Sequence, residues 1–84
     1  MKVWRLLAKA IRDPGSCRFA EIQTLVAALG FRLSRVAGSH HIYTHPGIPE
    51  IVNLQDVGGM AKAYQVRQVL KLMRRYNLTL ESHE

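Results

Sequence analysis

The fold of this 84-residue chain is decided by residues 31–45, which read FRLSRVAGSHHIYTH. Residues 31–36 alternate, with Phe31, Leu33 and Arg35 on one side and the intervening residues on the other. Alternation of this kind is typical of a β-strand. Residues 37–39 carry a Gly-Ser turn signal, and residues 40–45 predict a second strand. The stretch therefore predicts an antiparallel β-hairpin.

Helices are predicted on both sides of this hairpin, because apolar residues recur there at i, i+3, i+4 and i+7. The helical segments are residues 2–12, 19–29 and 63–76. Between the hairpin and the last helix, residues 46–49 predict a loop, 50–54 a short third strand and 55–61 a longer loop. The order α-α-β-β-β-α predicts an α+β fold with helices packed on a three-stranded antiparallel sheet. Without its first helix, this is the α-β-β-β-α order of double-stranded-RNA-binding domains.

Length and composition favour one small domain inside the cell. The chain is 48% hydrophobic, so a compact core can form without metals or disulfides. Its single cysteine, Cys17, cannot form an internal disulfide, which suits a reducing cytosol and a small, partly buried structural role. No apolar run approaches the ~20 residues that span a bilayer, and the N-terminus lacks a signal-peptide core. We therefore expect a cytoplasmic protein without a membrane anchor.

The charge is strongly positive, +6 at pH 7, and it is unevenly distributed. No acidic residue occurs between Asp56 and Glu81. The basic residues of that segment are Lys62, Arg67, Lys71, Arg74 and Arg75. A one-signed surface of this kind attracts polyanions, so nucleic acid is the favoured partner. The alternative is a solvated helix face without a partner.

Three of the four histidines lie in the hairpin, and proton transfer is the chemistry they fit best. On a regular strand His41 and His45 point the same way but lie about 13 Å apart, too far to share a metal ion. His40 and His41 face opposite sides, which argues against a two-histidine pair. One general acid/base histidine suffices for RNA cleavage, where the 2′-hydroxyl is the nucleophile. Ser39 and the backbone N–H groups of Gly38-Ser39 could hold a phosphate oxygen.

A histidine on a strand usually has a structural role. Only His40 and His41, next to the Gly-Ser turn, are candidates for a catalytic role. His45, which precedes Pro46, is interpreted as structural, and His83 as incidental. Tyr43 could stack a base or pack inward.

The same residues carry a family resemblance. The run from Gly30-Phe31 through Gly38-Ser39-His40-His41-Ile42-Tyr43 to His45-Pro46 resembles the signature of HicA toxins, also called YcfA-like mRNA interferases. Residues 52–59 and 64–70 are similar to the family's third strand and last helix. The resemblance covers residues 19–80. It implies one domain over 1–84, with an extra N-terminal helix and linker (1–16), a core (17–80) and a tail (81–84).

The resemblance also implies a function. It implies the toxin of a type II toxin–antitoxin system, an endoribonuclease that cleaves mRNA without metal or other cofactor and is neutralised by a HicB-type antitoxin. The family's catalytic histidine falls on His40, with His41 as the fallback, and Lys62 matches a basic position that would contact phosphate. Arg67, Lys71 and Arg74, spaced i, i+4, i+7, would steer RNA.

The chain departs from related sequences at the start of the last helix, where Met60 and Ala63 stand in place of the usual Lys and Pro. Two alternatives to the ribonuclease therefore stay open: an RNA-binding module without catalysis, and an inactive protein partner. The first helix is an addition to the minimal domain, expected to pack against the sheet edge or an antitoxin.

Overall fold

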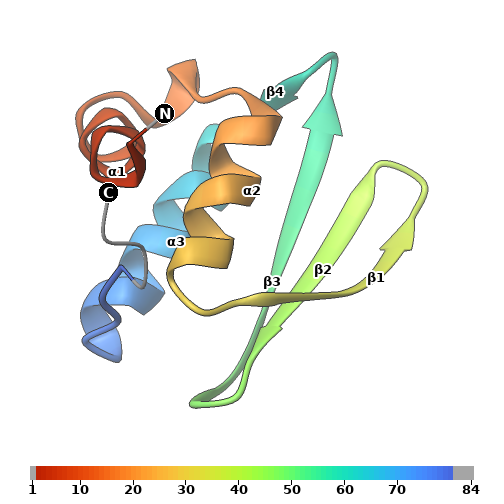
Figure 1. Cartoon of the computed structure of the whole chain (residues 1–84). Helices are drawn as coiled ribbons and strands as arrows, with labels where there is room; N and C mark the ends of the chain where they lie inside the picture. Colours follow the sequence, from red (N-terminus) through yellow and green to blue (C-terminus); the bar gives the residue numbers. More distant parts are fainter. Residues whose placement is uncertain (1, 81–84) are drawn as a thin grey trace.

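The computed structural model describes residues 2–80, so the predicted tail at 81–84, with His83, lies outside the described residues. The elements in chain order are α1 (Val3–Arg12), a 3-10 turn η1 (Pro14–Ser16), α2 (Phe19–Ala28), β1 (Arg32–Ala37), β2 (His40–His45), β3 (Ile48–Val57), β4 (Met60–Ala61) and α3 (Ala63–Arg75). The strands form one antiparallel sheet in the order β1-β2-β3-β4. All three helices lie to one side of it (Figure 1). The α+β class and the double-stranded-RNA-binding-like arrangement are confirmed, with four strands rather than three.

The third strand is longer than the sequence predicted, and the expected loop at 55–61 is wrong. Strand β3 continues to Val57, and Gly58 and Gly59 form a two-residue turn into β4. Both glycines have positive φ, 60° and 85°, as a type I′ hairpin turn requires. The Asp56 carboxylate accepts the Gly59 N–H at 2.8 Å and closes the turn. The chain therefore returns alongside β3 before α3 begins.

Strand β1 contains a bulge that simple alternation did not predict. The register shifts between Leu33 and Arg35, so that Leu33 pairs with Tyr43 and Val36 with His41. Because paired residues share a face of the sheet, Leu33 and Val36 lie on the same side instead of opposite sides. Every residue of β1 is exposed, so burial does not hold this edge strand to a strict alternation.

The core lies between the helices and the inner face of the sheet. Its largest fully buried side chains are Ile22, Leu25, Val26, Leu29, Val52, Leu54, Val66 and Val69. Tyr43 is also buried, and its hydroxyl accepts a hydrogen bond from Gln23 Nε2 at 3.1 Å, so it packs inward rather than facing a base. Cys17 is buried as expected, and burial raises the pKa of its thiol.

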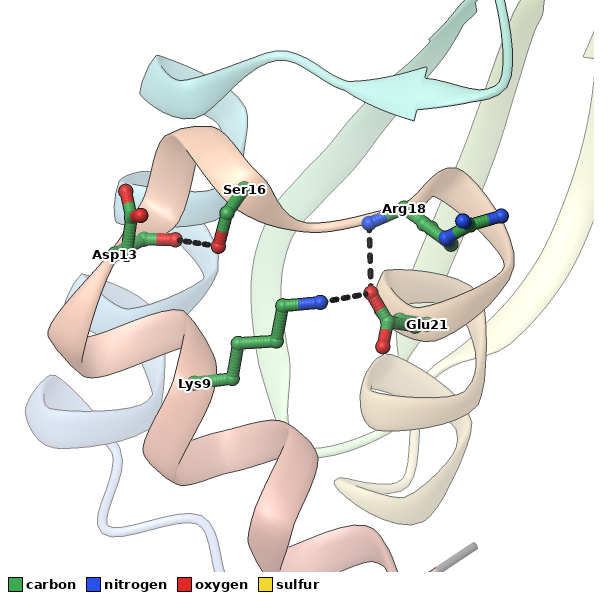
Figure 2. A network of polar contacts seen from close by, with 5 residues as sticks. All are labelled: Lys9, Asp13, Ser16, Arg18 and Glu21. Carbon is green, nitrogen blue, oxygen red and sulfur yellow. Dashed lines mark hydrogen bonds and ion pairs between the residues drawn. The ribbon is translucent and has the colours of Figure 1, made fainter.

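Helix α1 packs on α2 and α3, on the far side of the helical layer from the sheet (Figure 1). The expectation that it packs against the sheet edge is therefore wrong, because its buried stripe, Val3, Leu6 and Ala10, faces other helices. A polar contact fixes it to the start of α2 (Figure 2): Lys9 Nζ lies 2.9 Å from Glu21 Oε1, which also accepts the Arg18 N–H at 2.8 Å.

Candidate functional site

The alternation of β2 distributes its histidines over the two faces of the sheet. Tyr43 is buried against the helices, so His41 and His45, two residues before and after it, share that inner side. His40 therefore points to the opposite face, which no helix covers (Figure 1). The predicted separation of His40 and His41 onto opposite faces is confirmed.

On this open face His40 is oriented by a residue of the neighbouring strand. His40 Nδ1 lies 3.1 Å from Oδ1 of Asn53. An amide oxygen only accepts hydrogen bonds, so the contact assigns the imidazole proton to Nδ1. Within residues 2–80 no hydrogen bond engages the other ring nitrogen, Nε2. The arrangement holds one imidazole with a basic nitrogen available to a ligand.

His41 and His45 have packing contacts instead. The ring of His41 lies edge-to-face on Phe19, with centroids 4.7 Å apart, and its Nδ1 is 3.3 Å from the Ser39 carbonyl oxygen. His45 Nδ1 accepts the Gly47 N–H at 2.9 Å, and Nε2 is 3.2 Å from the Leu29 carbonyl. Both ring nitrogens of His45 are therefore engaged, which confirms its structural role.

Lys62 lies where β4 ends and α3 begins, and its contacts belong to the helix. The pairing of β4 with β3 ends before Lys62. The Lys62 carbonyl accepts the backbone N–H groups of Gln65 and Val66, and the Gln55 N–H donates to Gln65 Oε1. The Lys62 ammonium lies 5.9 Å from the centroid of the Tyr64 ring, so the structure places this predicted phosphate contact at Tyr64.

The Gly38-Ser39 turn is anchored next to His40. Gly38 has φ of 62°, which a side chain at this position would disfavour. The Ser39 carbonyl accepts the backbone N–H of Asp56 at 3.0 Å and ties the turn to β3. The turn is consequently a rigid support for the histidine that follows it.

The basic residues of α3 divide into two groups. Arg67 and Lys71 line a groove of about 370 Å³ together with Arg75 and Tyr64. Arg74 is exposed on the same helix but does not line the groove. The structure therefore brings together two of the three predicted α3 cations.

Glu50 of β3 closes one end of this groove. It lies 3.1 Å from Arg75 and accepts the Tyr76 hydroxyl at 2.6 Å. The hydrogen bond from the Tyr76 hydroxyl, with a smaller contribution from the Arg75 guanidinium, lowers the pKa of Glu50. Its negative charge is thereby compensated at that end.

Three residues of this region were not predicted from the sequence: Asn53, Gln55 and Tyr64. The first two had a detectable signal, because they alternate with buried Val52 and Leu54 on the same strand. Tyr64 had none, since an exposed tyrosine at a helix start is common. Tyr64 is 56% exposed here.

In the part of the chain that the structure describes, no group of three or more His, Cys, Asp or Glu side chains could hold a metal ion. None of the helices within residues 2–80 has the length and apolar character needed to cross a bilayer.

Comparison with known proteins identifies one family. The family model described as "HicA toxin of bacterial toxin-antitoxin" matches residues 19–74, from the first residue of α2 almost to the end of α3. The match includes the whole sheet and leaves α1 outside. Searches among curated proteins and among solved structures returned no match.

Proposed function

The chain belongs to the HicA family, the toxins of bacterial toxin–antitoxin systems, and from this premise we propose that it is a metal-independent endoribonuclease that cleaves mRNA. The general acid/base is His40. The observation that supports this assignment is the contact of His40 Nδ1 with Asn53, which leaves Nε2 available on the open face.

The reaction requires little chemistry from the protein, because RNA contains its own nucleophile. The 2′-oxygen forms a bond to the adjacent phosphorus as its proton passes to His40 Nε2, and the bond from phosphorus to the 5′-oxygen breaks. The departing 5′-oxygen takes a proton from water, and a 2′,3′-cyclic phosphate remains. The Gly38-Ser39 turn next to His40, together with the ammonium of Lys62, would stabilise the phosphate charge.

The fallback assignment to His41 has less support. His41 lies against Phe19 on the inner side, where an RNA strand on the open face does not reach it. Its ring contacts identify it instead as a residue that holds β2 on α2.

A HicB-type antitoxin is the proposed partner, and the cytoplasm, where mRNA is available, is the proposed location. Such an antitoxin would cover His40 and place acidic residues against the cations of α3. Electrostatic complementarity of this kind favours fast association between toxin and antitoxin.

Induction in cells without antitoxin tests this function. Wild type, His40→Ala and His41→Gln are induced in parallel while growth and mRNA integrity are followed, and protein levels are matched by immunoblot. Growth arrest with mRNA loss is expected for wild type and His41→Gln but not for His40→Ala. If His40→Ala still arrests growth and His41→Gln does not, His41 is the general acid/base instead of His40. If none of the three proteins causes growth arrest, the result favours an RNA-binding module without catalysis or an inactive protein partner.

A further inference from the structure

The groove along α3 has a form and a charge that the cleavage chemistry at His40 does not itself use. Its volume of about 370 Å³ lies within the range of about 300–1,000 Å³ that is typical of ligand pockets. One wall is the outer face of α3, and Glu50 of β3 closes the end near Arg75. The other end is occupied by Tyr64, at the start of α3.

The middle of the groove is positively charged. Arg67 and Lys71 are one helical turn apart, so their side chains lie on the same face of α3. Within residues 2–80 neither of them takes part in an ion pair, whereas Arg75 pairs with Glu50. Two adjacent cations without protein counter-ions are complementary to a ligand that carries successive negative charges.

Tyr64 adds an aromatic surface to these cations. Tyr64 is 56% exposed and does not belong to the core. The Lys62 ammonium lies over the ring, 5.9 Å from its centroid, so a cation faces one side of the ring and a base would stack on the other. An exposed aromatic between cations can stack one nucleobase while the cations bind the neighbouring phosphates.

Hydrogen bonds tie the start of the groove to the strand that pairs with His40. Gln55 pairs with His40, and its backbone N–H donates to Oε1 of buried Gln65 at 2.8 Å. Gln65 Nε2 donates to the hydroxyl of its neighbour Tyr64 at 3.3 Å. These contacts hold Tyr64 at a fixed place relative to β3.

We propose that this groove is a binding subsite for single-stranded RNA, in which Tyr64 stacks one base and Arg67 and Lys71 bind the phosphates that follow it. The inference rests on the proposed function, because it places the strand that flanks the cleaved bond. Bases inside a duplex are already stacked on both faces and cannot lie on the ring. The subsite therefore selects unpaired RNA.

Fluorescence anisotropy of a 5′-labelled 12-nucleotide RNA tests this inference. All proteins carry His40→Ala so that the RNA stays intact, and circular dichroism verifies that each is folded. Tyr64→Ala should weaken binding about tenfold, whereas Tyr64→Phe should stay within about twofold, because the ring provides the stacking surface. A duplex of the same sequence should bind less tightly than the single strand.

The charge contribution has a matched control. Arg67→Gln and Lys71→Gln should each lower the salt dependence, log Kd against log salt, by about 0.7, the value for one phosphate of a single strand. Arg12→Gln removes the same charge from α1, which lies away from the groove, and should leave the slope unchanged.

Several results would overturn the subsite. Equal losses in Tyr64→Ala and Tyr64→Phe would assign the effect to the hydroxyl, and equal or tighter binding of the duplex would exclude selection for unpaired RNA. Tighter binding of an acidic decapeptide than of RNA would reassign the groove to a protein partner. The proposed function fails separately: if the chain with native His40 does not cleave RNA, the catalytic assignment is wrong while these binding results still decide the subsite.

Discussion

Substitution of Asn53 is the most informative perturbation of the proposed active site, because Asn53 contacts the catalytic imidazole and not the core. Its amide oxygen accepts the proton of His40 Nδ1 at 3.1 Å on the exposed face. Asn53→Ala removes this contact and allows the ring to rotate and to exchange its proton between the two nitrogens. Asn53 is therefore a positioning residue.

The size of the effect follows from the contact. A neutral hydrogen bond has a net value of about 0.5–1.5 kcal/mol. Because 1.36 kcal/mol corresponds to tenfold in rate, kcat should fall by roughly two- to twelvefold. KM should stay unchanged, since the lost contact is made to His40 and not to the substrate. The exposed position limits the change in unfolding free energy to about 0.5 kcal/mol.

Steady-state cleavage of a fluorogenic RNA oligonucleotide measures both parameters. Asn53→Asp provides a second readout: a carboxylate next to His40 favours the imidazolium, so the acidic limb of the pH–rate profile should move to higher pH. Thr44→Val, on the same open face without a hydrogen bond to His40, is the control. Unchanged kcat in Asn53→Ala, together with an unchanged pH profile in Asn53→Asp, would refute the positioning role.

Three further predictions concern stability, and thermal and urea unfolding measure all of them. Ala63→Pro should raise the unfolding free energy by about 0.4–1 kcal/mol, because Ala63 is the first residue of α3 and the residue before it is extended. Glu21→Gln should cost about 0.5–1 kcal/mol at pH 7, since the amide can still accept the Arg18 N–H but loses the charge that strengthens this cap and pairs with Lys9. That hydrogen bond, and then Lys9, lowers the pKa of Glu21 below its usual 4.5, so the stabilisation is complete above pH 4.5 and is lost as pH falls through the lowered value. A difference between wild type and Glu21→Gln that persists in acid would contradict this. Gly59→Ala should cost about 1–2 kcal/mol because its φ is 85°, whereas Gly15→Ala, without positive φ, should cost less.

The hairpin and the helices could be predicted from the sequence because their signals are local. Alternation in residues 40–45 and the i, i+3, i+4 spacing in the helices depend only on neighbouring side chains. Strand β4 could not be found in this way, since two residues are too few to show a period. Its turn had a signal, Gly58-Gly59, that we interpreted as a loop. The bulge in β1 left no signal, because no buried residue fixes the register of that strand.

The site was predictable in part, for the same reason. Alternation separates His40 from His41, but only the burial of Tyr43 shows which of them faces the helices. The orienting contact of Asn53 crosses between strands, and the groove joins Glu50 to α3 across the fold. Such contacts depend on tertiary packing and cannot be read from spacing along the chain.

Cleavage of a 5′-labelled RNA by the purified protein, with and without EDTA, is the most direct test of the central claim. We expect cleavage by wild type and by His41→Gln that EDTA does not reduce, a 2′,3′-cyclic phosphate on the upstream product, and no cleavage by folded His40→Ala. Cleavage by His40→Ala at the wild-type rate, or activity that EDTA abolishes, would contradict it.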